Sequence, residues 1–294
     1  VKMKKINIFC FGFGQVAKNF IYSLIKSYDV NLATTSRDKT EKKKIYGINY
    51  INYHLLDDSF DKGILKKIKN YDYILVSIPP KNGIDIVIKN FQDNLEVLKP
   101  NWITYLSATS VYGDHNGKWV NEDSKLNPLT ENGKSRLNAE KSWLSFAKKK
   151  NLPIQIFRLS GIYSQEKNIF KKIKSGSHKI INKPKHFFSR IHVEDISNIL
   201  KKTLDPKKIK SGEIYNLSDD YPCSNIEVAN YAYDLMKISK PKMIETSEIE
   251  NEMLRNFYKD SKKVSNKKIK EVFSYKLKFP TYKEGLRSIF NYIS

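Results

Sequence analysis

The sequence predicts an α/β fold: a doubly wound parallel sheet with a smaller C-terminal lobe. Three observations support this class. Short β-rich runs alternate with helical patterns through the first half of the chain, the first run is apolar almost throughout, and a glycine-rich turn follows it directly. This alternation is typical of parallel strands joined by crossover helices, and a continuously apolar strand is typical of one buried on both faces.

The first half of the sequence accounts for the predicted sheet. Residues 5–11 form a buried strand, and the helix after it repeats apolar side chains at helical spacing. Residues 30–35 and 48–53 are the next two strands, and residues 73–78 form a fourth strand that stops at two prolines. The remaining elements of this half are the helix 84–98, the strand 102–106, the helix 136–150 and the strand 153–158.

Beyond about residue 160 the alternation becomes irregular. Apolar faces at helical spacing return at 196–204, 228–235 and 286–293. We therefore predict two interleaved domains, a sheet domain at 1–160 and a smaller lobe at 161–294. In such folds the ligand crevice lies at the carboxyl ends of the strands.

The composition excludes several classes of protein. Hydrophobic residues make up 40% of the chain, which is enough for a substantial core and argues against disorder. The net charge of +22 comes mostly from lysines scattered along the chain, and no nucleic-acid motif organises them, so we expect no specific nucleic-acid partner. We expect no membrane span and no metal site, and the two cysteines favour the reducing cytoplasm.

The turn Gly12-Phe-Gly14-Gln-Val-Ala17 matches the dinucleotide fingerprint of a Rossmann-type domain. Gly12 permits the tight turn, Gly14 lets the backbone approach a pyrophosphate, and the small Ala17 allows close packing of the helix. The N-terminus of the helix offers N–H groups and positive potential to the phosphates. The predicted cofactor residues here and after the fourth strand are Gly12, Phe13, Gly14, Gln15, Val16, Ser77, Ile78 and Pro79.

The end of the second strand favours NADP over NAD. An NAD site usually places a carboxylate there for the ribose 2′-hydroxyl, but this chain has Thr34-Thr35-Ser36-Arg37. Ser36 and Arg37 can bind a 2′-phosphate, the guanidinium bidentately. In the alternative, Arg37 is a solvated turn residue and Asp38 takes the place of the usual carboxylate.

Several further motifs resemble one family. They are Leu106-Ser-Ala-Thr-Ser-Val-Tyr-Gly-Asp114, Arg158 at the end of a strand, Arg190-Ile-His-Val-Glu-Asp195 and Glu213-Ile-Tyr-Asn-Leu-Ser-Asp219. In this order they resemble an atypical extended short-chain dehydrogenase/reductase of the NAD(P)-dependent epimerase/dehydratase superfamily. The resemblance implies a homodimer interface at the helices 83–98 and 133–150.

The catalytic triad of that superfamily is replaced. The resemblance aligns Ala108 with the family's Ser or Thr, Asn132 with its Tyr and Arg136 with its Lys. An amide is no acid or base near neutral pH, and a guanidinium stays protonated, so the usual proton relay is absent. Arg136 can still hold a ribose or a substrate anion, and Asn132 can donate a hydrogen bond to a carbonyl.

The resemblance also supplies candidates for the remaining roles. Tyr112 and Thr109 join Asn132 and Arg136 as predicted catalytic residues. The predicted substrate-binding residues are Arg158, Tyr163, Arg190 and His192. The expected function is an NADP(H)-binding reductase or epimerase that acts on a polar, anionic small molecule such as a nucleotide sugar. The alternative is a redox-inactive dinucleotide-binding or sensor protein.

Overall fold

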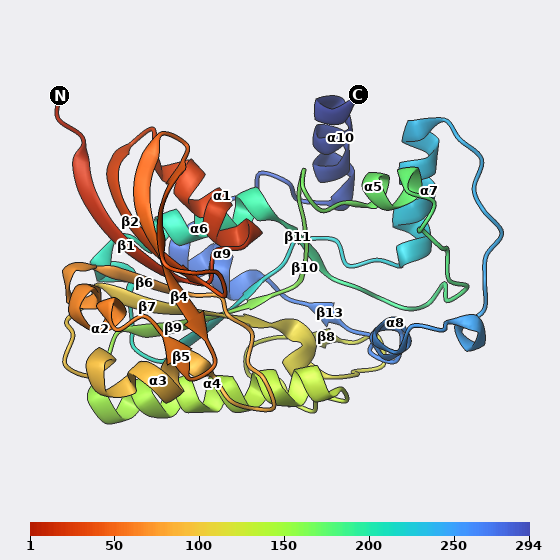
Figure 1. Cartoon of the computed structure of the whole chain (residues 1–294). Coiled ribbons are helices and arrows are strands. Elements are labelled where there is room, and N and C mark those ends of the chain that lie inside the picture. The colour runs from red at the N-terminus through yellow and green to blue at the C-terminus, as the bar shows by residue number, and fades with distance from the viewer. The chain divides into compact units, whose positions relative to one another are not determined.

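A computed structural model describes all 294 residues, which form two compact units interleaved along the chain (Figure 1). The predicted α/β class with a mostly parallel central sheet is confirmed. Whether 1–160 and 161–294 act as separate cofactor and substrate domains stays a prediction. Unit 1 comprises residues 1–108, 134–158 and 196–215, and unit 2 comprises residues 109–133, 159–195 and 216–294.

The central sheet has the strand order β12-β9-β7-β6-β1-β2-β4-β3, and β5 pairs with β4. Pairing is parallel between β1 and β2, β1 and β6, β2 and β4, and β6 and β7. The chain leaves β1 on one side for β2 and later returns on the other side at β6, which is the topology of a doubly wound sheet. The strands are β1 (Lys4–Phe11), β2 (Tyr28–Ser36), β3 (Glu41–Ile45), β4 (Ile48–Leu56), β5 (Ser59–Phe60), β6 (Tyr73–Val76), β7 (Trp102–Ala108), β9 (Ile154–Leu159) and β12 (Glu213–Leu217).

Strand β1 is buried on both faces, as its composition predicts. The side chains of Ile8, Phe9, Cys10 and Phe11 are all fully buried, although neighbours in a strand point to opposite sides. Only a strand in the middle of a sheet covered on both sides has this pattern. The central position of β1 brings the turn that follows it to the middle of the sheet edge.

Helices cover the two faces of the sheet within unit 1. In Figure 1, α3 (Ile86–Leu95) and α4 (Glu131–Lys150) lie along one side, and α1 (Gln15–Leu24) and α6 (Val193–Lys202) along the other. Asp85 caps α3 through the N–H groups of Val87 and Ile88, and its second oxygen accepts a 3.0 Å hydrogen bond from Nε1 of Trp143 in α4. This carboxylate fixes the two helices to one another.

The sequence prediction missed strand β3. Its residues Glu41–Ile45 pair antiparallel with β4 at the edge of the sheet, through a turn in which Tyr46 and Gly47 both have positive φ. Three consecutive lysines hid the strand, but lysines are what a solvent-facing edge strand tolerates. The helix predicted at 136–150 also begins earlier than expected, at Glu131.

Unit 2 consists of two short strand pairs and a group of helices. Helices α7 and α10 pack through a core that includes Val228, Ala232, Leu286 and Ile289. Across both units, no helix is long and apolar enough to cross a membrane. The elements are β8 (Trp119–Val120) with β13 (Lys263–Val264), β10 (Gly161–Tyr163) with β11 (Arg190–His192), α5 (Ile169–Lys174), α7 (Asn225–Met236), α8 (Glu252–Phe257), α9 (Lys267–Phe273) and α10 (Tyr282–Ile293).

Candidate functional site

Hydrogen bonds within unit 1 hold the glycine turn after β1. The backbone N–H of Gly12 donates to the Thr35 hydroxyl over 3.0 Å, and Gly12 has a φ of +83°. A Cβ at Gly12 would lie 3.0 Å from the hydroxyl oxygen of Ser77, so this position requires glycine. The Ser77 hydroxyl donates to the carbonyls of Phe11 and Gly12, each over 3.3 Å. The turn is thereby fixed to the ends of β1, β2 and β6.

Gly14 leaves an open space at the N-terminus of α1. It is the N-cap of this helix, no side chain caps the helix, and no acidic residue lies in its first turn. A Cβ added at Gly14 would meet no atom within 4 Å. The first N–H groups of a helix have no acceptor within the helix and carry positive potential, so a pyrophosphate group fits this place. Ala17, which the fingerprint requires to be small, is fully buried.

The other residues predicted around the glycine turn have different environments. The Phe13 ring lies 5.7 Å from the Tyr50 ring of β4, centroid to centroid. Val16 is 7% exposed, so its backbone is the part that a ligand can reach. Ile78 is half-buried, and its Cγ1 lies 3.1 Å from the place of a Cβ at Gly12. The structure therefore brings Ile78 to the turn, while Pro79 follows it along the chain.

The end of β2 presents Arg37 to solvent. The hydroxyl of Ser36 accepts hydrogen bonds from the backbone N–H of Asp38 over 3.2 Å and from Nδ2 of Asn52 over 2.9 Å. Arg37 is exposed, and its carbonyl oxygen lies 3.0 Å from Nδ1 of His54. The Arg37 backbone is therefore anchored while its guanidinium points away from the core, a geometry that suits contact with a phosphate.

Arg136 lies beside the end of β7. Its Nη1 donates to the hydroxyl of Tyr105 over 3.2 Å and to the carbonyl of Leu106 over 3.1 Å. Burial raises the pKa of Tyr105, and the nearby guanidinium opposes that shift. Because Tyr105 is fully buried, it cannot meet a ligand; Arg136 is only half-buried and can.

Arg158 is placed differently from the prediction that it binds substrate. It is 1% exposed, and its Nη2 and Nε donate to Oε2 and Oε1 of Glu140 over 2.8 and 3.0 Å. Oε1 of Glu140 also accepts a 2.5 Å hydrogen bond from the hydroxyl of Ser107. A buried arginine with its own carboxylate partner joins α4 to β9 and leaves no exposed surface for a substrate, so this geometry does not support a binding role.

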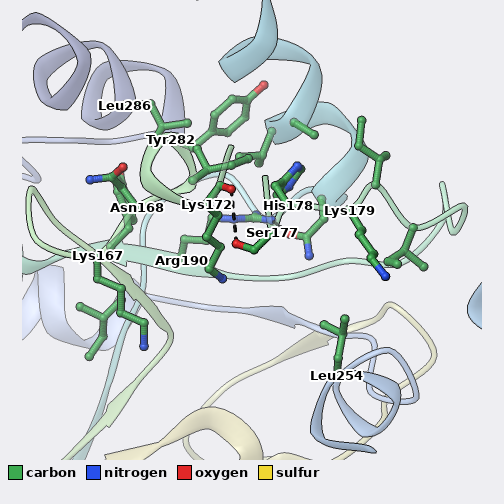
Figure 2. Close-up of a pocket in the computed structure, with 18 of the residues that line it drawn as sticks. Lys167, Asn168, Lys172, Ser177, His178, Lys179, Arg190, Leu254, Tyr282 and Leu286 are labelled. Carbon is green, nitrogen blue, oxygen red and sulfur yellow. Dashed lines mark hydrogen bonds between the residues drawn. The ribbon is translucent and has the colours of Figure 1, made fainter. Parts of the chain in front are cut away.

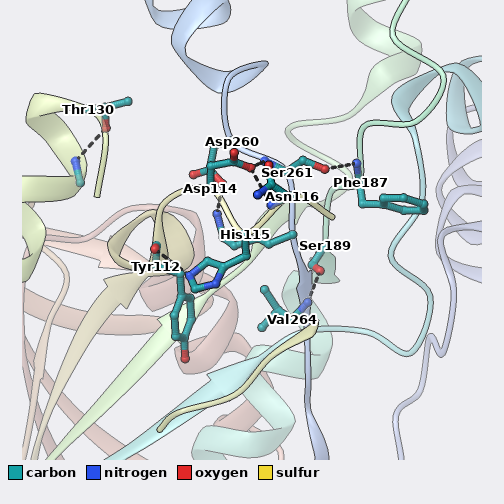
Figure 3. A network of polar contacts seen from close by, with 12 residues as sticks. Tyr112, Asp114, His115, Asn116, Thr130, Phe187, Ser189, Asp260, Ser261 and Val264 are labelled. Carbon is teal, nitrogen blue, oxygen red and sulfur yellow. Dashed lines mark hydrogen bonds and ion pairs between the residues drawn. The ribbon is translucent and has the colours of Figure 1, made fainter. Parts of the chain in front are cut away.

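The polar groups of Tyr112 are also hydrogen-bonded within its own unit. Its side chain is fully buried, and its hydroxyl donates to Oδ1 of Asn216 over 2.6 Å. Its carbonyl oxygen lies 3.0 Å from Nε2 of His115, in a network of polar contacts that also includes Asp114 and Ser261 (Figure 3). This network joins three segments of unit 2. The geometry favours a structural role for Tyr112 over an acid–base role.

The remaining predicted catalytic residues lie near solvent. Thr109 is half-buried and opens the short 3-10 helix Thr109–Tyr112, directly after Ala108 at the end of β7. Asn132 is exposed in the first turn of α4. The next residue, Gly133, is buried, and its N–H donates to the hydroxyl of Thr130 over 3.0 Å. Both polar side chains are therefore accessible to a small molecule.

A pocket of about 310 Å³ lies entirely within unit 2 (Figure 2). Its lining includes four cationic side chains and no carboxylate, together with apolar side chains such as Ile169, Val228 and Leu286. A volume of this size is at the lower end of the range for small-molecule sites. The pocket therefore suits an anion that also has an apolar part. The cationic side chains are Lys167, Lys172, Lys179 and Arg190.

Arg190 is the most fixed of these cations. Its Nη1 donates to the carbonyl of Phe188 over 3.2 Å and to the carbonyl of Cys223 over 3.3 Å, and its Nη2 donates to Oδ1 of Asn225. All three acceptors are neutral, so these hydrogen bonds orient the guanidinium without neutralising its charge. The prediction that Arg190 binds substrate is compatible with this position.

Tyr163 lines the same pocket, but its hydroxyl is buried. The side chain is 9% exposed, and its hydroxyl has no hydrogen-bond partner. A Cβ at Gly285 would lie 1.9 Å from this oxygen, so the ring fits only because α10 has a glycine there. This oxygen is enclosed against α10 and has no surface that a ligand can reach, so Tyr163 lines the pocket with its other atoms.

His192 does not line the pocket. It is 3% exposed, its Nδ1 accepts a hydrogen bond from the N–H of Glu194 over 3.1 Å, and its ring packs 4.1 Å from the Phe279 ring. Burial lowers the pKa of His192 to about 4. A neutral histidine that caps the first turn of α6 is a structural residue, so the geometry does not support substrate binding by His192.

Sequence reasoning missed most of the pocket. Lys167, Lys172 and Lys179 could not be selected from 47 lysines, because composition does not reveal which of them face one cavity. Asn225 had no signal either, although it orients Arg190 and donates to the Tyr258 hydroxyl over 3.1 Å. The family resemblance supplied the two lining residues that were predicted, Tyr163 and Arg190.

Comparison with known proteins shows which sequences the chain is similar to. No family model matches it. The dTDP-D-glucose 4,6-dehydratase of Dictyostelium discoideum is 25% identical over 215 residues, which cover 63% of this chain and 48% of that protein. The chain thus spans about half the length of this curated relative.

Two solved structures are similar over almost the whole chain. A functionally unknown conserved protein from Silicibacter pomeroyi is 29% identical with a TM-score of 0.85, covering 99% of this chain and 100% of that one. A UDP-glucuronic acid 4-epimerase from Bacillus cereus, solved in complex with NAD, is 16% identical with a TM-score of 0.79 and coverage of 98% of both chains. At that identity the epimerase shows the fold alone.

The fold and the glycine turn define a Rossmann-type protein of the dinucleotide-binding class. The chain is similar in sequence to a dTDP-D-glucose 4,6-dehydratase, and it shares its fold with solved nucleotide-sugar epimerases and dehydratases, as an extended short-chain dehydrogenase/reductase would. The resemblance predicted from the sequence motifs is confirmed at this level.

Proposed function

We propose that the chain is an enzyme that binds a nicotinamide dinucleotide in unit 1 and acts on an anionic small molecule related to the nucleotide sugars. The observation that carries this proposal is the glycine turn. Gly12 is fixed by Thr35 and Ser77, and Gly14 leaves open space at an uncapped helix N-terminus. The Bacillus cereus epimerase with this fold was solved with NAD, which supports the same class of cofactor here.

Different residues of unit 1 would contact different parts of the dinucleotide. The pyrophosphate would lie against Gly14 and the N–H groups of α1, with Phe13, Ser77 and Ile78 beside it. Arg136 is the predicted partner of the nicotinamide ribose, because its guanidinium is held at the end of β7. When bound, the nicotinamide ring gives or accepts a hydride.

We further propose that NADP is preferred to NAD. Its support is the end of β2, where the Ser36 hydroxyl and the exposed Arg37 stand in place of the usual carboxylate. A 2′-phosphate would gain a charge-assisted contact with Arg37, whereas a 2′-hydroxyl would gain only a neutral one.

The substrate anion is assigned to the pocket of unit 2. Arg190 and three lysines supply positive charge there without any lining carboxylate. These groups are suited to a phosphate or carboxylate. We propose that 1–160 is the cofactor part of the chain and that 161–294 is the substrate part.

The chemistry is proposed to proceed without the Ser/Tyr/Lys triad, since Ala108, Asn132 and Arg136 occupy the aligned positions. Thr109, Asn132 and Arg136 remain as catalytic candidates because each is accessible. Tyr112 is not a catalytic candidate, because its hydroxyl is buried and donates a hydrogen bond to Asn216.

Nicotinamide fluorescence tests the proposal. Purified protein is titrated with NADPH and NADH, and then assayed with a panel of nucleotide sugars for conversion to epimers, dehydrated sugars or oxidised sugars. Saturable dinucleotide binding and conversion of at least one nucleotide sugar are expected. Absence of saturable binding would contradict the cofactor assignment, and binding without conversion of any member would contradict the substrate assignment.

A further inference from the structure

Asp219 is a buried carboxyl in unit 2, hydrogen-bonded through its backbone to Arg190 of the basic pocket. It follows β12 and is 2% exposed, although it does not line the pocket. Its backbone N–H donates to the carbonyl of Arg190 over 2.7 Å, so the two residues lie on adjacent segments. Its Oδ1 accepts a hydrogen bond from the N–H of Tyr221 over 2.9 Å, while its Oδ2 is buried without any partner.

The charges near Asp219 shift the pKa of its carboxyl in both directions. Burial raises the pKa of this carboxyl to about 8, the Arg190 guanidinium opposes the shift, and Asp220 and Asp195 reinforce it. Asp219 is also the second cause, after burial, of the raised pKa of the Tyr163 hydroxyl. The hydrogen bonds place Asp219 near the guanidinium of Arg190: Oδ1 of Asp219 accepts from the N–H of Tyr221, and the carbonyl of Cys223, two residues further on, accepts from Arg190 Nη1.

We propose that Asp219 sets the affinity of this pocket for anions, by taking up a proton when an anion binds beside Arg190. The inference rests on the proposed assignment of the substrate anion to this pocket. It adds a residue outside the lining that determines how strongly the site prefers anionic ligands.

The physical reason for this proton uptake is competition between Asp219 and the anion for the charge of Arg190. An ionised Asp219 and a bound anion would both draw on the charge of one guanidinium, and they would repel one another through a poorly screened interior. Protonation of Asp219 removes that repulsion and leaves the Arg190 charge to the ligand. By linkage, an anion that binds the protonated form more tightly must raise the proton affinity of Asp219 by the same factor.

Inorganic sulfate is a suitable probe, because its charge is constant between pH 6 and pH 9 by ordinary acid–base chemistry. Calorimetric titrations in buffers of different ionisation enthalpy measure the number of protons taken up per bound sulfate. If the anion raises the pKa of Asp219 by about one unit, an uptake of about half a proton is expected near pH 8.5, with almost none at pH 6.5. The affinity for sulfate is expected to fall by up to about tenfold as the pH rises past the pKa values of Asp219 in the free and the sulfate-bound protein.

Two variants and one direct measurement complete the test. Asp219→Asn should abolish the proton uptake, whereas Asp234→Asn, which removes an exposed carboxylate from α7, should retain it. Sulfate bound elsewhere on this basic chain would contribute no uptake that depends on Asp219. If Asp219→Asn does not fold, carboxyl carbon NMR of the wild-type chain reports the pKa of Asp219 with and without sulfate.

Sulfate binding without proton uptake, or an unchanged Asp219 pKa on binding, would overturn the inference. Failure of sulfate to bind would overturn it as well, together with the assignment of the pocket to an anion. Dinucleotide binding is measured on the same samples by nicotinamide fluorescence. A loss there would contradict the cofactor assignment in unit 1 and would leave the result for Asp219 standing.

Discussion

The hydroxyl of Thr35, at the end of β2, accepts a 3.0 Å hydrogen bond from the backbone N–H of Gly12 in the turn after β1. Thr35 is fully buried, and Gly12 has the positive φ that the turn requires. A side chain from one strand therefore fixes the glycine turn that follows its neighbour. The stiffness of the proposed dinucleotide site depends on a residue outside the glycine motif.

Thr35→Val is expected to weaken dinucleotide binding. Valine has nearly the same shape but cannot accept the Gly12 hydrogen bond, so a buried N–H loses its partner at a cost of about 1–3 kcal/mol in the free energy of unfolding. Fluorescence titration with NADPH measures the affinity. Thr34→Val is the matched control, because Thr34 donates to Asn52 over 2.9 Å and should change stability without changing affinity.

Gly14→Ala should separate binding from folding. A Cβ at Gly14 meets no protein atom within 4 Å and Gly14 has a φ of −88°, so the unfolding temperature should be nearly unchanged. The methyl group would occupy the space proposed for the pyrophosphate, so affinity for NADPH should fall at least tenfold. Gly12→Ala, in contrast, should destabilise the fold itself, since it combines a φ of +83° with a 3.0 Å contact to Ser77. Unimpaired binding by the alanine variant at Gly14 would place the dinucleotide elsewhere.

Arg37→Lys should weaken NADP binding more than NAD binding. Lysine keeps the charge but loses the planar fork that binds a phosphate bidentately, so a loss of roughly tenfold for NADPH is expected against little change for NADH. Lys39→Arg is a control at an exposed neighbouring position. Equal effects of Arg37→Lys on the two dinucleotides would contradict the proposed preference.

Glu140→Gln is expected to destabilise the chain strongly. It would leave the guanidinium of Arg158, which is 1% exposed, without its charged partner, and loss of one member of such a buried pair costs about 3–5 kcal/mol. Urea denaturation measures the loss. Replacing both residues by methionine should recover part of it; a fully stable Glu140→Gln variant would show that the ion pair is dispensable and would return Arg158 to the list of substrate-binding candidates.

Stability should fall as the pH rises from 7 to 8. The pKa of Asp219 is raised from 3.8 to about 8, so the folded chain holds a proton that the unfolded chain has lost. The resulting stabilisation is complete below pH 3.8 and is lost as the pH rises towards 8, and between pH 7 and 8 Asp219 contributes a fall of about 1 kcal/mol. Burial also lowers the pKa values of His178, His186 and His192, so near pH 7 the unfolded chain binds more protons at these histidines than the folded chain does. They offset part of the fall, and the comparison with Asp219→Asn isolates the Asp219 contribution.

Chemical denaturation at several pH values between 7 and 8 measures the slope. Asp219→Asn should flatten it, because the amide does not titrate, while Asp234→Asn should keep the wild-type slope. An identical slope in both variants would assign the pH dependence to other groups.

Local sequence was sufficient to predict the elements whose pattern of residues lies within a short stretch of the chain. The apolar run of β1, the glycine turn and the amphipathic α1 all follow from residues that are close in the chain, and the structure has them as predicted. The edge strand β3 was missed, because an edge strand facing solvent has no apolar alternation to reveal it.

The candidate site was predictable only in part. The order of motifs predicted the resemblance to the epimerase/dehydratase superfamily. Local spacing predicted the glycine turn, because its residues act through backbone geometry. It did not separate Arg190, which lines a pocket, from Arg158, which is buried against Glu140. Both are arginines at the predicted substrate side, and only their surroundings differ.

The sequence by itself determined the doubly wound fold and the position of the glycine turn, since periodicity and backbone requirements are local. The tertiary structure alone decided which polar groups are paired. Arg158 meets Glu140 across 18 residues, and Tyr112 meets Asn216 across 104, so their availability to a ligand is fixed by contacts that no local pattern encodes. The same holds for Asp219, because its proton affinity is set by burial and by its coupling to Arg190.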